Sequence, residues 1–312
     1  MYSPLVSIVI PLFNKEKYVL ECLRSVSAQS YRNWECIIID DGSTDGSVQI
    51  VRDYVNEFPG NWKINGQNNG GPASARNFGI SCCTGEYIAF LDADDIWFPN
   101  KLLDQTNYFK KYPNVSLVLT NYIVFSNFSK LNLRGIRSPH VKKLLKHWLD
   151  MRGFGGLVES TGMLRSSKLT NELLFSDELK TGEGLDFVIR WNLYTEVRVL
   201  RRFLTLYRIS NEQLHKQENL IQVNVETLTN IYSPLGAEGK RIRARQKAYF
   251  ALSAMRAWPK VKIVKRLLAN VTNLNWQLII MAAWISSRNL RAIFLSSNTK
   301  RRCKAIFSNI DS

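Results

Sequence analysis

The sequence is poor in the residues that build zinc sites and disulfide frameworks. Only three histidines occur, and the five cysteines are odd in number and show no CxxC spacing. Zinc sites and disulfide frameworks both need such residues at regular spacings. The composition therefore predicts neither, and the free cysteines favour a reducing compartment, the cytoplasm.

Long apolar runs are also missing. The longest near-continuous run covers about residues 278–285, far short of the roughly 20 residues that a membrane-spanning helix needs. The N-terminus enters a strand pattern directly, without the basic segment and cleavage site of a signal peptide. We therefore expect neither a transmembrane segment nor a signal peptide.

Acidic residues are absent from one long segment. Residues 239–310 hold sixteen of the 42 Lys and Arg and no Asp or Glu, so the net charge of +16 originates there. Interleaved basic and apolar residues, with several tryptophans, favour a helical segment that binds an anionic membrane surface. A solvated helical cap on the preceding domain is the alternative. The residues before this segment show no motif that recognises nucleic-acid bases, so no nucleic-acid partner is expected.

The first 120 residues alternate between the strand and the helix period. Near-unbroken apolar strands are predicted at about 6–10, 36–39, 62–65, 87–91 and 115–120, and helices at about 15–28, 47–55, 73–82 and 99–111. This alternation is typical of an α/β fold with a mostly parallel, doubly wound sheet flanked by helices. A further helix is predicted over 182–194. We assign residues 1–215 to this domain and 216–312 to a basic helical C-terminal extension.

Carboxylates follow one of these strands directly, in Leu91-Asp92-Ala93-Asp94-Asp95. Two carboxylates spaced i, i+2 at a strand end point to the same side and can hold a hard divalent cation. Such a cation neutralises the charge that builds on a departing diphosphate. A solvated acidic turn explains a bare DxD tripeptide as well, but its place after a buried strand favours a ligand site at the edge where α/β sheets bind ligands.

Two other segments end near that edge. Asp40-Asp41-Gly42-Ser43 can cap the following helix, or one Asp can accept hydrogen bonds from a nucleobase or ribose. Asn69 to Asn77 places small residues before a helix and Arg76 on its first turns, where it could approach a phosphate; a tight turn with a surface arginine is equally compatible. Neither GxGxxG nor GxxxxGK[ST] occurs, so dinucleotide and P-loop sites lack support.

Taken in order, four segments closely resemble the family 2 glycosyltransferases of the GT-A fold: Val6–Asn14, Asp40–Asp45, Asn69–Gly79 and Leu91–Trp97. Weaker similarity continues to about residue 215. The resemblance implies a nucleotide-sugar donor and a divalent cation, Mn²⁺ or Mg²⁺. It also implies a role for each matched residue: Pro11, Phe13 and Asn14 line the nucleotide pocket, Asp41 meets the base, Asp92 lies near the ribose and metal, and Asp94 binds the metal directly.

The catalytic base is where the sequence departs from this family. Members usually carry a Glu-Asp pair at the mouth of a helix, and here Gly184 stands in place of the second acid. Glu183 and Asp186 lie i, i+3 on one helical face, and either is a candidate to deprotonate the acceptor. Both are also explained as N-terminal carboxylates favoured by the helix dipole.

The function expected is an inverting transfer of a sugar from a nucleotide-diphosphate donor to a glycan or lipid-linked glycan acceptor in surface polysaccharide biosynthesis. The enzyme would act peripherally on the cytoplasmic face of the membrane. Two alternatives remain. Gly184 is compatible with a catalytically impaired nucleotide-sugar-binding protein. A sugar-nucleotide nucleotidyltransferase would need a Gly-rich basic loop after the first strand, where this chain has Pro11-Leu12-Phe13-Asn14.

Overall fold

The structure, a computed structural model, describes residues 3–125, 131–134, 159–179 and 183–209. The strands are β1 (Val6–Leu12), β2 (Trp34–Asp40), β3 (Trp62–Gly66), β4 (Tyr87–Phe90), β5 (Ile96–Trp97), β6 (Val115–Phe125), β7 (Leu131–Arg134), β8 (Met163–Arg165) and β9 (Glu196–Arg208). The helices are α1 (Val19–Ser27), α2 (Ser47–Glu57), α3 (Pro72–Ser81), α4 (Lys101–Lys111) and α6 (Glu183–Tyr194). Short 3₁₀ turns follow at η1 (Glu159–Thr161), η2 (Ser166–Lys168) and η3 (Asn171–Leu173).

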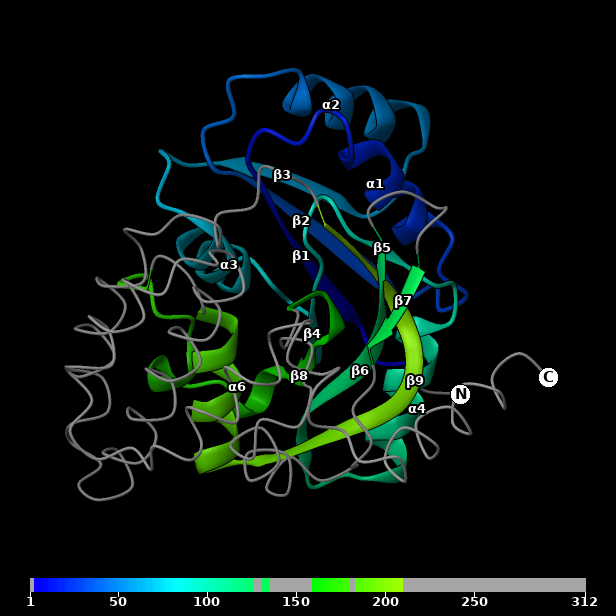
Figure 1. The fold of residues 1–312 in the computed structure, drawn as a ribbon, viewed down its shortest axis with the longest axis vertical. Coiled ribbons are helices and arrows are strands. Elements are labelled where there is room, and N and C mark those ends of the chain that lie inside the picture. Colours follow the sequence, from blue (N-terminus) through cyan, green and yellow to red (C-terminus); the bar gives the residue numbers. More distant parts are fainter. Residues whose placement is uncertain (1–2, 126–130, 135–158, 180–182, 210–312) are drawn as a thin grey trace, which may run out of the picture. The chain divides into compact units, whose positions relative to one another are not determined.

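The strands form one curled sheet in the order β3-β2-β1-β4-β8-β6-β9-β5, with β7 paired to β6 (Figure 1). Strands β3, β2, β1 and β4 are all parallel. From β8 onwards the sheet is mixed, because β8 runs antiparallel to both β4 and β6 while β6 and β9 are parallel. The predicted α/β fold is confirmed, and its strictly parallel part is the N-terminal half.

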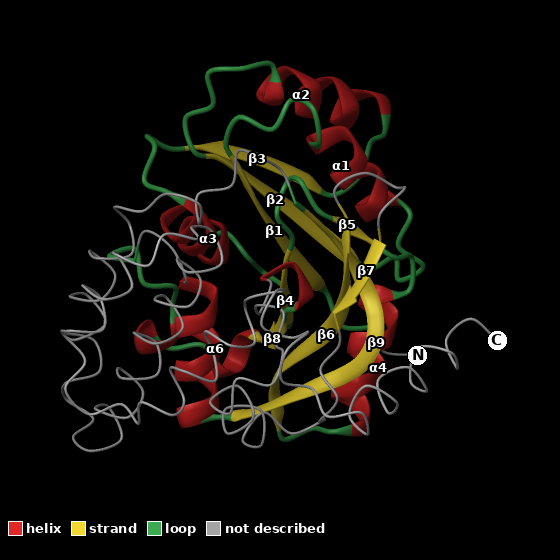
Figure 2. Ribbon diagram, in the orientation of Figure 1, coloured by secondary structure: helices red, strands yellow, loops and turns green. Residues whose placement is uncertain are grey.

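Both faces of the sheet are covered by helices (Figure 2). Along β1, the side chains of Val6, Ile8, Ile10 and Leu12 are at most 1% exposed and belong to the apolar cluster that includes residues of α1, α2 and α4. Val9, which points the opposite way, belongs to the cluster built from residues of α3 and α6. Burial on both faces explains why this strand reads as an unbroken apolar run.

The predicted elements of the N-terminal half all occur. Two boundaries differ clearly: β6 continues to Phe125 rather than ending near residue 120, and α1 begins at Val19 rather than near Lys15. Asn14 adopts a positive φ of 51°, and the backbone N–H of Lys15 donates to Ser47 Oγ at 2.7 Å, so the chain turns before the helix begins. The short strands β5 and β8 gave no separate periodic signal.

The carboxyl ends of the parallel strands meet at one edge. Leu12 is opposite Asp40 in the sheet, and Asp40 is opposite Gly66. The backbone N–H of Leu91 donates to the carbonyl of Val9 at 3.1 Å, which brings the segment after β4 to the same edge. The two acidic segments therefore lie along the edge that the sequence predicted.

The predicted extension, residues 216–312, lies outside the described residues, so its helices and its boundary at residue 215 stay predictions. Where the chain is described, none of its helices combines the length and the apolarity needed to cross a membrane.

Candidate active site

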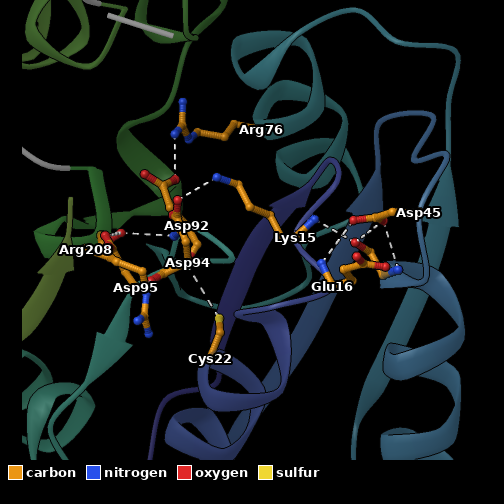
Figure 3. Close-up of polar contacts among 11 residues, drawn as sticks. Lys15, Glu16, Cys22, Asp45, Arg76, Asp92, Asp94, Asp95 and Arg208 are labelled. Carbon is orange, nitrogen blue, oxygen red and sulfur yellow. Dashed lines mark hydrogen bonds and ion pairs between the residues drawn. The ribbon is translucent and has the colours of Figure 1, made fainter. Parts of the chain in front are cut away.

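The loop after β4 presents two carboxylates that are each bound by a cation (Figure 3). Asp92 Oδ1 lies 2.6 Å from Arg76 Nη2, and Asp94 Oδ2 lies 2.6 Å from Lys15 Nζ. The second oxygen of each carboxylate has no hydrogen-bond partner within the described segments. One face of the loop is therefore fixed by the protein, and one oxygen of each Asp is available to a ligand.

The third aspartate of this loop holds it in place. Asp95 is fully buried and accepts hydrogen bonds from Ser160 Oγ at 2.5 Å and from the backbone N–H of Arg208 at 2.9 Å. Arg208 also donates through Nε to the carbonyl of Asp94 at 2.8 Å. Burial, with smaller contributions from Asp94 and Asp92, raises the pKa of Asp95 well above its ordinary range. Asp95 is thus a support for its two neighbours, a role that the sequence did not reveal.

The carboxylate oxygens of this loop suit a divalent cation that is held jointly with a diphosphate. Across the described ranges no three His, Cys, Asp or Glu side chains come together as a metal cage. Mg²⁺ and similar hard ions are commonly bound by one or two carboxylates, with substrate phosphates and water completing the shell. The free oxygens of Asp92 and Asp94 offer that arrangement.

Lys15 is a second cation at this loop that the sequence did not single out. Burial acts to lower its pKa, but the ion pair and hydrogen bond with Asp94, with further help from Asp92 and Asp95, outweigh burial and raise it. Lys15 therefore stays charged and competes with any metal ion for Asp94. Its place directly after Asn14, in the loop that follows β1, was the available signal.

Asp41 is bound by the loop that leads into α3. Its carboxylate accepts hydrogen bonds from the backbone N–H groups of Gly70 and Gly71, both at 2.8 Å, and from Gln67 Nε2 at 2.7 Å. Asp41 is only 3% exposed. Asp41 therefore does not cap α2, the helix for which a cap was predicted, and instead binds the loop before α3, while near α2 Asp45 accepts from the backbone N–H of Ser47. A contact between Asp41 and a nucleobase stays a prediction.

The three pocket residues predicted after β1 have different surroundings. Pro11 is buried within β1, whereas Phe13 follows the strand and is 42% exposed. Asn14 connects two loops, because its backbone N–H donates to Ser43 Oγ at 3.1 Å and its Oδ1 accepts from the Thr44 N–H at 2.8 Å. Phe13 and Asn14 thus stand at the carboxyl edge of the sheet, and Pro11 lies within the sheet.

Arg76 joins the loop after β4, which holds Asp92, Asp94 and Asp95 and is called the donor loop below, to α6. Its guanidinium donates to Asp92 through Nη2 and to Glu183 Oε1 through Nη1, the latter at 3.1 Å, and it lies 5.3 Å from the ring of Phe175. The side chain is 3% exposed. It is therefore a buried bridge between two carboxylates and not the surface arginine of the alternative interpretation.

The two predicted base candidates have separate partners. Glu183 is 8% exposed and contacts Arg76. Asp186 is fully buried and forms an ion pair of 2.6 Å with Arg190, one turn later on the same helix. Of the two, only Glu183 is connected to the donor loop by the contacts described.

A further carboxylate, Glu159, lies beside them and was missed from the sequence. A Cβ atom built on Gly184 would lie 1.6 Å from Glu159 Oε1, so the Glu159 carboxylate fills the space next to that glycine. Burial above all, with Asp92 and Glu183, raises the pKa of Glu159 to about 8 against the opposing effect of Arg76. The one signal in the sequence was the missing acid at Gly184.

The chain is similar in sequence to known glycosyltransferases. The model of glycosyl transferase family 2 matches residues 7–168. An uncharacterized glycosyltransferase of Rickettsia typhi is 40% identical over 219 residues, which cover 68% of this chain and 66% of that protein. Glycosyltransferase GlyG of Streptococcus pneumoniae is 43% identical over 94 residues, 30% of this chain and 31% of that protein. The chain spans between about a third and two thirds of the length of these curated relatives.

Solved structures share the fold at low sequence identity. Staphylococcus aureus TarS 1–349 in complex with UDP-GlcNAc superposes with a TM-score of 0.61 at 22% identity, over 81% of this chain and 71% of that one. The mannosyltransferase PcManGT from Pyrobaculum calidifontis, in complex with GDP-Man and Mn²⁺, gives 0.57 at 17% identity, over 94% and 83%. The fold is that of GT-A glycosyltransferases, and the chain belongs to glycosyltransferase family 2.

Proposed function

We propose that this chain transfers a sugar from a nucleotide-diphosphate donor to the hydroxyl group of a glycan or lipid-linked glycan, with inversion at the anomeric carbon. The observation that carries the proposal is the donor loop, in which Asp92 and Asp94 each keep one free oxygen at the ligand-binding edge of the sheet. Family membership and the donors named for TarS and PcManGT, UDP-GlcNAc and GDP-Man, support a nucleotide sugar as substrate.

The nucleotide would lie along the edge formed by β1, β2 and α3. Phe13 offers an exposed ring there, and Asn14 and Asp41 hold the flanking loops. Small residues at Gly70 and Gly71 keep the loop close to the carboxylate of Asp41 and leave the beginning of α3 open to a phosphate or base.

The diphosphate would lie against the donor loop. Asp94, with Asp92 beside it, would hold a divalent cation, Mn²⁺ or Mg²⁺. That cation supplies neutralisation of the charge that builds on the leaving phosphate oxygen. Arg76 keeps Asp92 oriented, and Asp95 with Arg208 keeps the loop backbone in position. Fixed charges of this kind need no reorganisation as the bond to the sugar breaks.

A carboxylate beside the beginning of α6 would accept the acceptor's proton. Glu183 and Asp186 are the residues that the family resemblance offered, and their ion pairs with Arg76 and Arg190 hold them in place. Attack from the face opposite the leaving diphosphate inverts the anomeric centre.

Nucleotide release from a panel of nucleotide sugars tests the proposal. The panel includes UDP-GlcNAc and GDP-mannose, and release of UDP or GDP is measured with Mn²⁺, with Mg²⁺ and with chelator. We expect metal-dependent release from at least one donor and a loss of about 100-fold or more in Asp94→Asn. Asp53→Asn, an exposed Asp on α2, is the matched control. Release that is unaffected by Asp94→Asn would contradict the metal assignment.

A catalytically impaired nucleotide-sugar-binding protein is the second candidate, and the glycine at position 184 favours it. Such a protein would gain thermal stability from a nucleotide sugar with Mn²⁺, because binding to the native state raises its melting temperature, yet would release no nucleotide. A nucleotidyltransferase would instead consume a nucleoside triphosphate and a sugar phosphate. Attachment to a membrane surface through residues 216–312 stays part of the proposal, and pelleting with anionic vesicles tests it.

A further inference from the structure

Gly184 is a glycine at a position where the backbone does not require one. It is the second residue of α6, and Ala in a helix is favoured over Gly by about 1 kcal/mol. Its φ does not fall in the left-handed region. Neither helix geometry nor a turn therefore accounts for the glycine, and the explanation must lie in what occupies the space beside it.

The side chain of Glu159 occupies that space. From the position of a Cβ on Gly184, Glu159 Oε1 would be 1.6 Å away, Cδ 2.3 Å and Cγ 2.8 Å. Real Cβ atoms do not approach other heavy atoms so closely, so any side chain at 184 would displace the carboxylate of Glu159. The two positions thus share one site, and a carboxylate fills it from η1 instead of from α6.

Glu159 is tied to the donor loop through the residue that follows it. Ser160 Oγ accepts a hydrogen bond from the backbone N–H of Asp92 at 3.0 Å and donates to Asp95 at 2.5 Å. The position of η1 is therefore fixed relative to the carboxylates that would hold the metal. A shift of the donor loop would move Glu159 with it.

The wall beneath this carboxylate is apolar. Together with Glu159 and Gly184, one small cavity is lined by Phe90, Leu117, Leu119, Phe175, Phe187 and Val188. Within the described part of the chain, no Lys or Arg forms an ion pair with Glu159, whereas Glu183 and Asp186 each have one. Arg76 acts on Glu159 through its charge, but its hydrogen bonds to carboxylates go to Asp92 and Glu183. A carboxylate against an apolar wall and without a hydrogen-bonded cation is suited to take up a proton near neutral pH.

We propose that Glu159 is the general base of the reaction and takes the place of the acid missing at Gly184. The inference rests on the proposed glycosyl transfer. The acceptor O–H proton passes to a carboxylate oxygen of Glu159, and the acceptor oxygen forms a bond to the anomeric carbon. The bond from that carbon to the diphosphate breaks, and its electron pair leaves with the nucleoside diphosphate. Glu183 then positions Arg76, and Asp186 fixes α6 through Arg190.

The first experiment compares Glu159→Gln with Glu178→Gln, an exposed glutamate of the same region. Release of UDP from UDP-GlcNAc and of GDP from GDP-mannose is measured with Mn²⁺ and with water as acceptor. Removal of a general base costs about 100-fold to 10,000-fold, so Glu159→Gln should lose at least about 100-fold and Glu178→Gln nothing. The thermal stabilisation of Glu159→Gln by donor and Mn²⁺ should remain.

The second experiment moves the acid back to α6. Glu159→Gly empties the shared space, and Gly184→Asp fills it from the other side. The double variant should recover most of the activity that Glu159→Gly loses. Azide adds a third readout, because this anion attacks the anomeric carbon without a proton to remove. It should restore nucleotide release in Glu159→Gly but not in Asp94→Asn.

The outcomes separate this inference from the proposed function. If the wild-type chain releases nucleotide and Glu159→Gln does so equally fast, Glu159 is not the base and the proposed transfer stands. Loss of activity that neither Gly184→Asp nor azide restores, in a variant that still binds donor, assigns Glu159 a positioning role and overturns the inference. If the wild-type chain releases nucleotide from no donor, the proposed function itself fails, and the inference with it.

Discussion

In the parallel half of the sheet, Asp41 meets backbone N–H groups 29 and 30 residues further along the chain, whereas beside the mixed half Arg76 meets a carboxylate 107 residues away. The first arrangement uses neutral donors fixed by a turn and a helix start. The second places a guanidinium between Asp92 and Glu183, which come from different elements. We call the first arrangement the nucleotide side and the second the acceptor side, after their proposed roles. The nucleotide side uses neutral donors of one loop, and the acceptor side uses ion pairs between charged side chains.

Loss of a binding partner should therefore reduce the free energy of unfolding by different amounts on the two sides. A backbone N–H that loses a buried acceptor leaves one neutral group unsatisfied. A buried charge that loses its counter-charge is far more costly. Substitutions on the acceptor side should therefore destabilise the fold more than substitutions on the nucleotide side.

Arg76→Met is the change expected to have the largest effect. It leaves Asp92 and Glu183 near each other without the cation between them, and breaking a buried ion pair in this way costs roughly 3–5 kcal/mol. Chemical unfolding should show this loss, and nucleotide release should fall with it because Asp92 is no longer oriented. Arg52→Met, on the exposed face of α2, is the control. A stability of Arg76→Met within about 0.5 kcal/mol of wild type would show that the bridge is not a source of stability.

Asp41→Ala tests the nucleotide side and should have a smaller effect. The N–H groups of Gly70 and Gly71 would lose their acceptor, at a cost of about 1–3 kcal/mol. Loosening of the loop before α3 should also weaken stabilisation by a nucleotide sugar. Asp41→Asn keeps one acceptor oxygen and should fall between Ala and wild type. An Asp41→Ala variant that is as strongly destabilised as Arg76→Met would remove the distinction between the two sides, and one as stable as Asp53→Ala would show that these hydrogen bonds add no stability.

Lys15→Met removes the ion pair between the loop after β1 and Asp94. A divalent cation at Asp94 has to compete with Lys15 Nζ, which lies 2.6 Å from Oδ2. Removal of that competition should lower the Mn²⁺ concentration needed for half-maximal thermal stabilisation, by roughly fivefold for about 1 kcal/mol. Lys17→Met is the control from the same loop. A higher Mn²⁺ requirement would indicate instead that Lys15 supports the bound diphosphate.

The sequence predicted the parallel half well because its signals are local. Apolar runs such as Cys36 to Ile39 are buried on both faces, and each is followed within a few residues by turn or helix-start residues. The acidic segments could be placed at one sheet edge because parallel strands end at the same edge. The structure adds the order and register of the strands and the later start of α1.

The acceptor side could not be predicted in the same way. Glu159 stands in no motif that the sequence offered, and its importance depends on a glycine 25 residues later whose missing side chain leaves room for it. Asp95 was grouped with its neighbours because all three are aspartates, although only its burial against Ser160 and Arg208 separates it from them. Such roles arise from packing between distant segments, which periodicity does not encode.

Glu35 examines the parallel half on its own. Its carboxylate is 1% exposed and accepts hydrogen bonds from Lys63 Nζ at 2.7 Å, Ser7 Oγ at 2.5 Å and the backbone N–H of Thr84 at 2.7 Å. Burial acts to raise its pKa, but these bonds outweigh it and lower the pKa from 4.5 to about 2.

Because the folded-state pKa of Glu35 lies below the unfolded one, its ionised form stabilises the fold fully above a pH of 4.5, and this contribution is lost as the pH falls towards 2. Glu35→Gln should therefore lower the urea midpoint at neutral pH and have less effect near pH 3, roughly midway through that window. Glu57→Gln, at the exposed end of α2, should leave both midpoints unchanged. A deficit of Glu35→Gln that is equal at both pH values would mean that its stabilising effect comes from packing and hydrogen bonding that do not depend on charge. The local network of the parallel half would then resemble the neutral contacts of Asp41 and differ in kind from the ion pairs around Arg76.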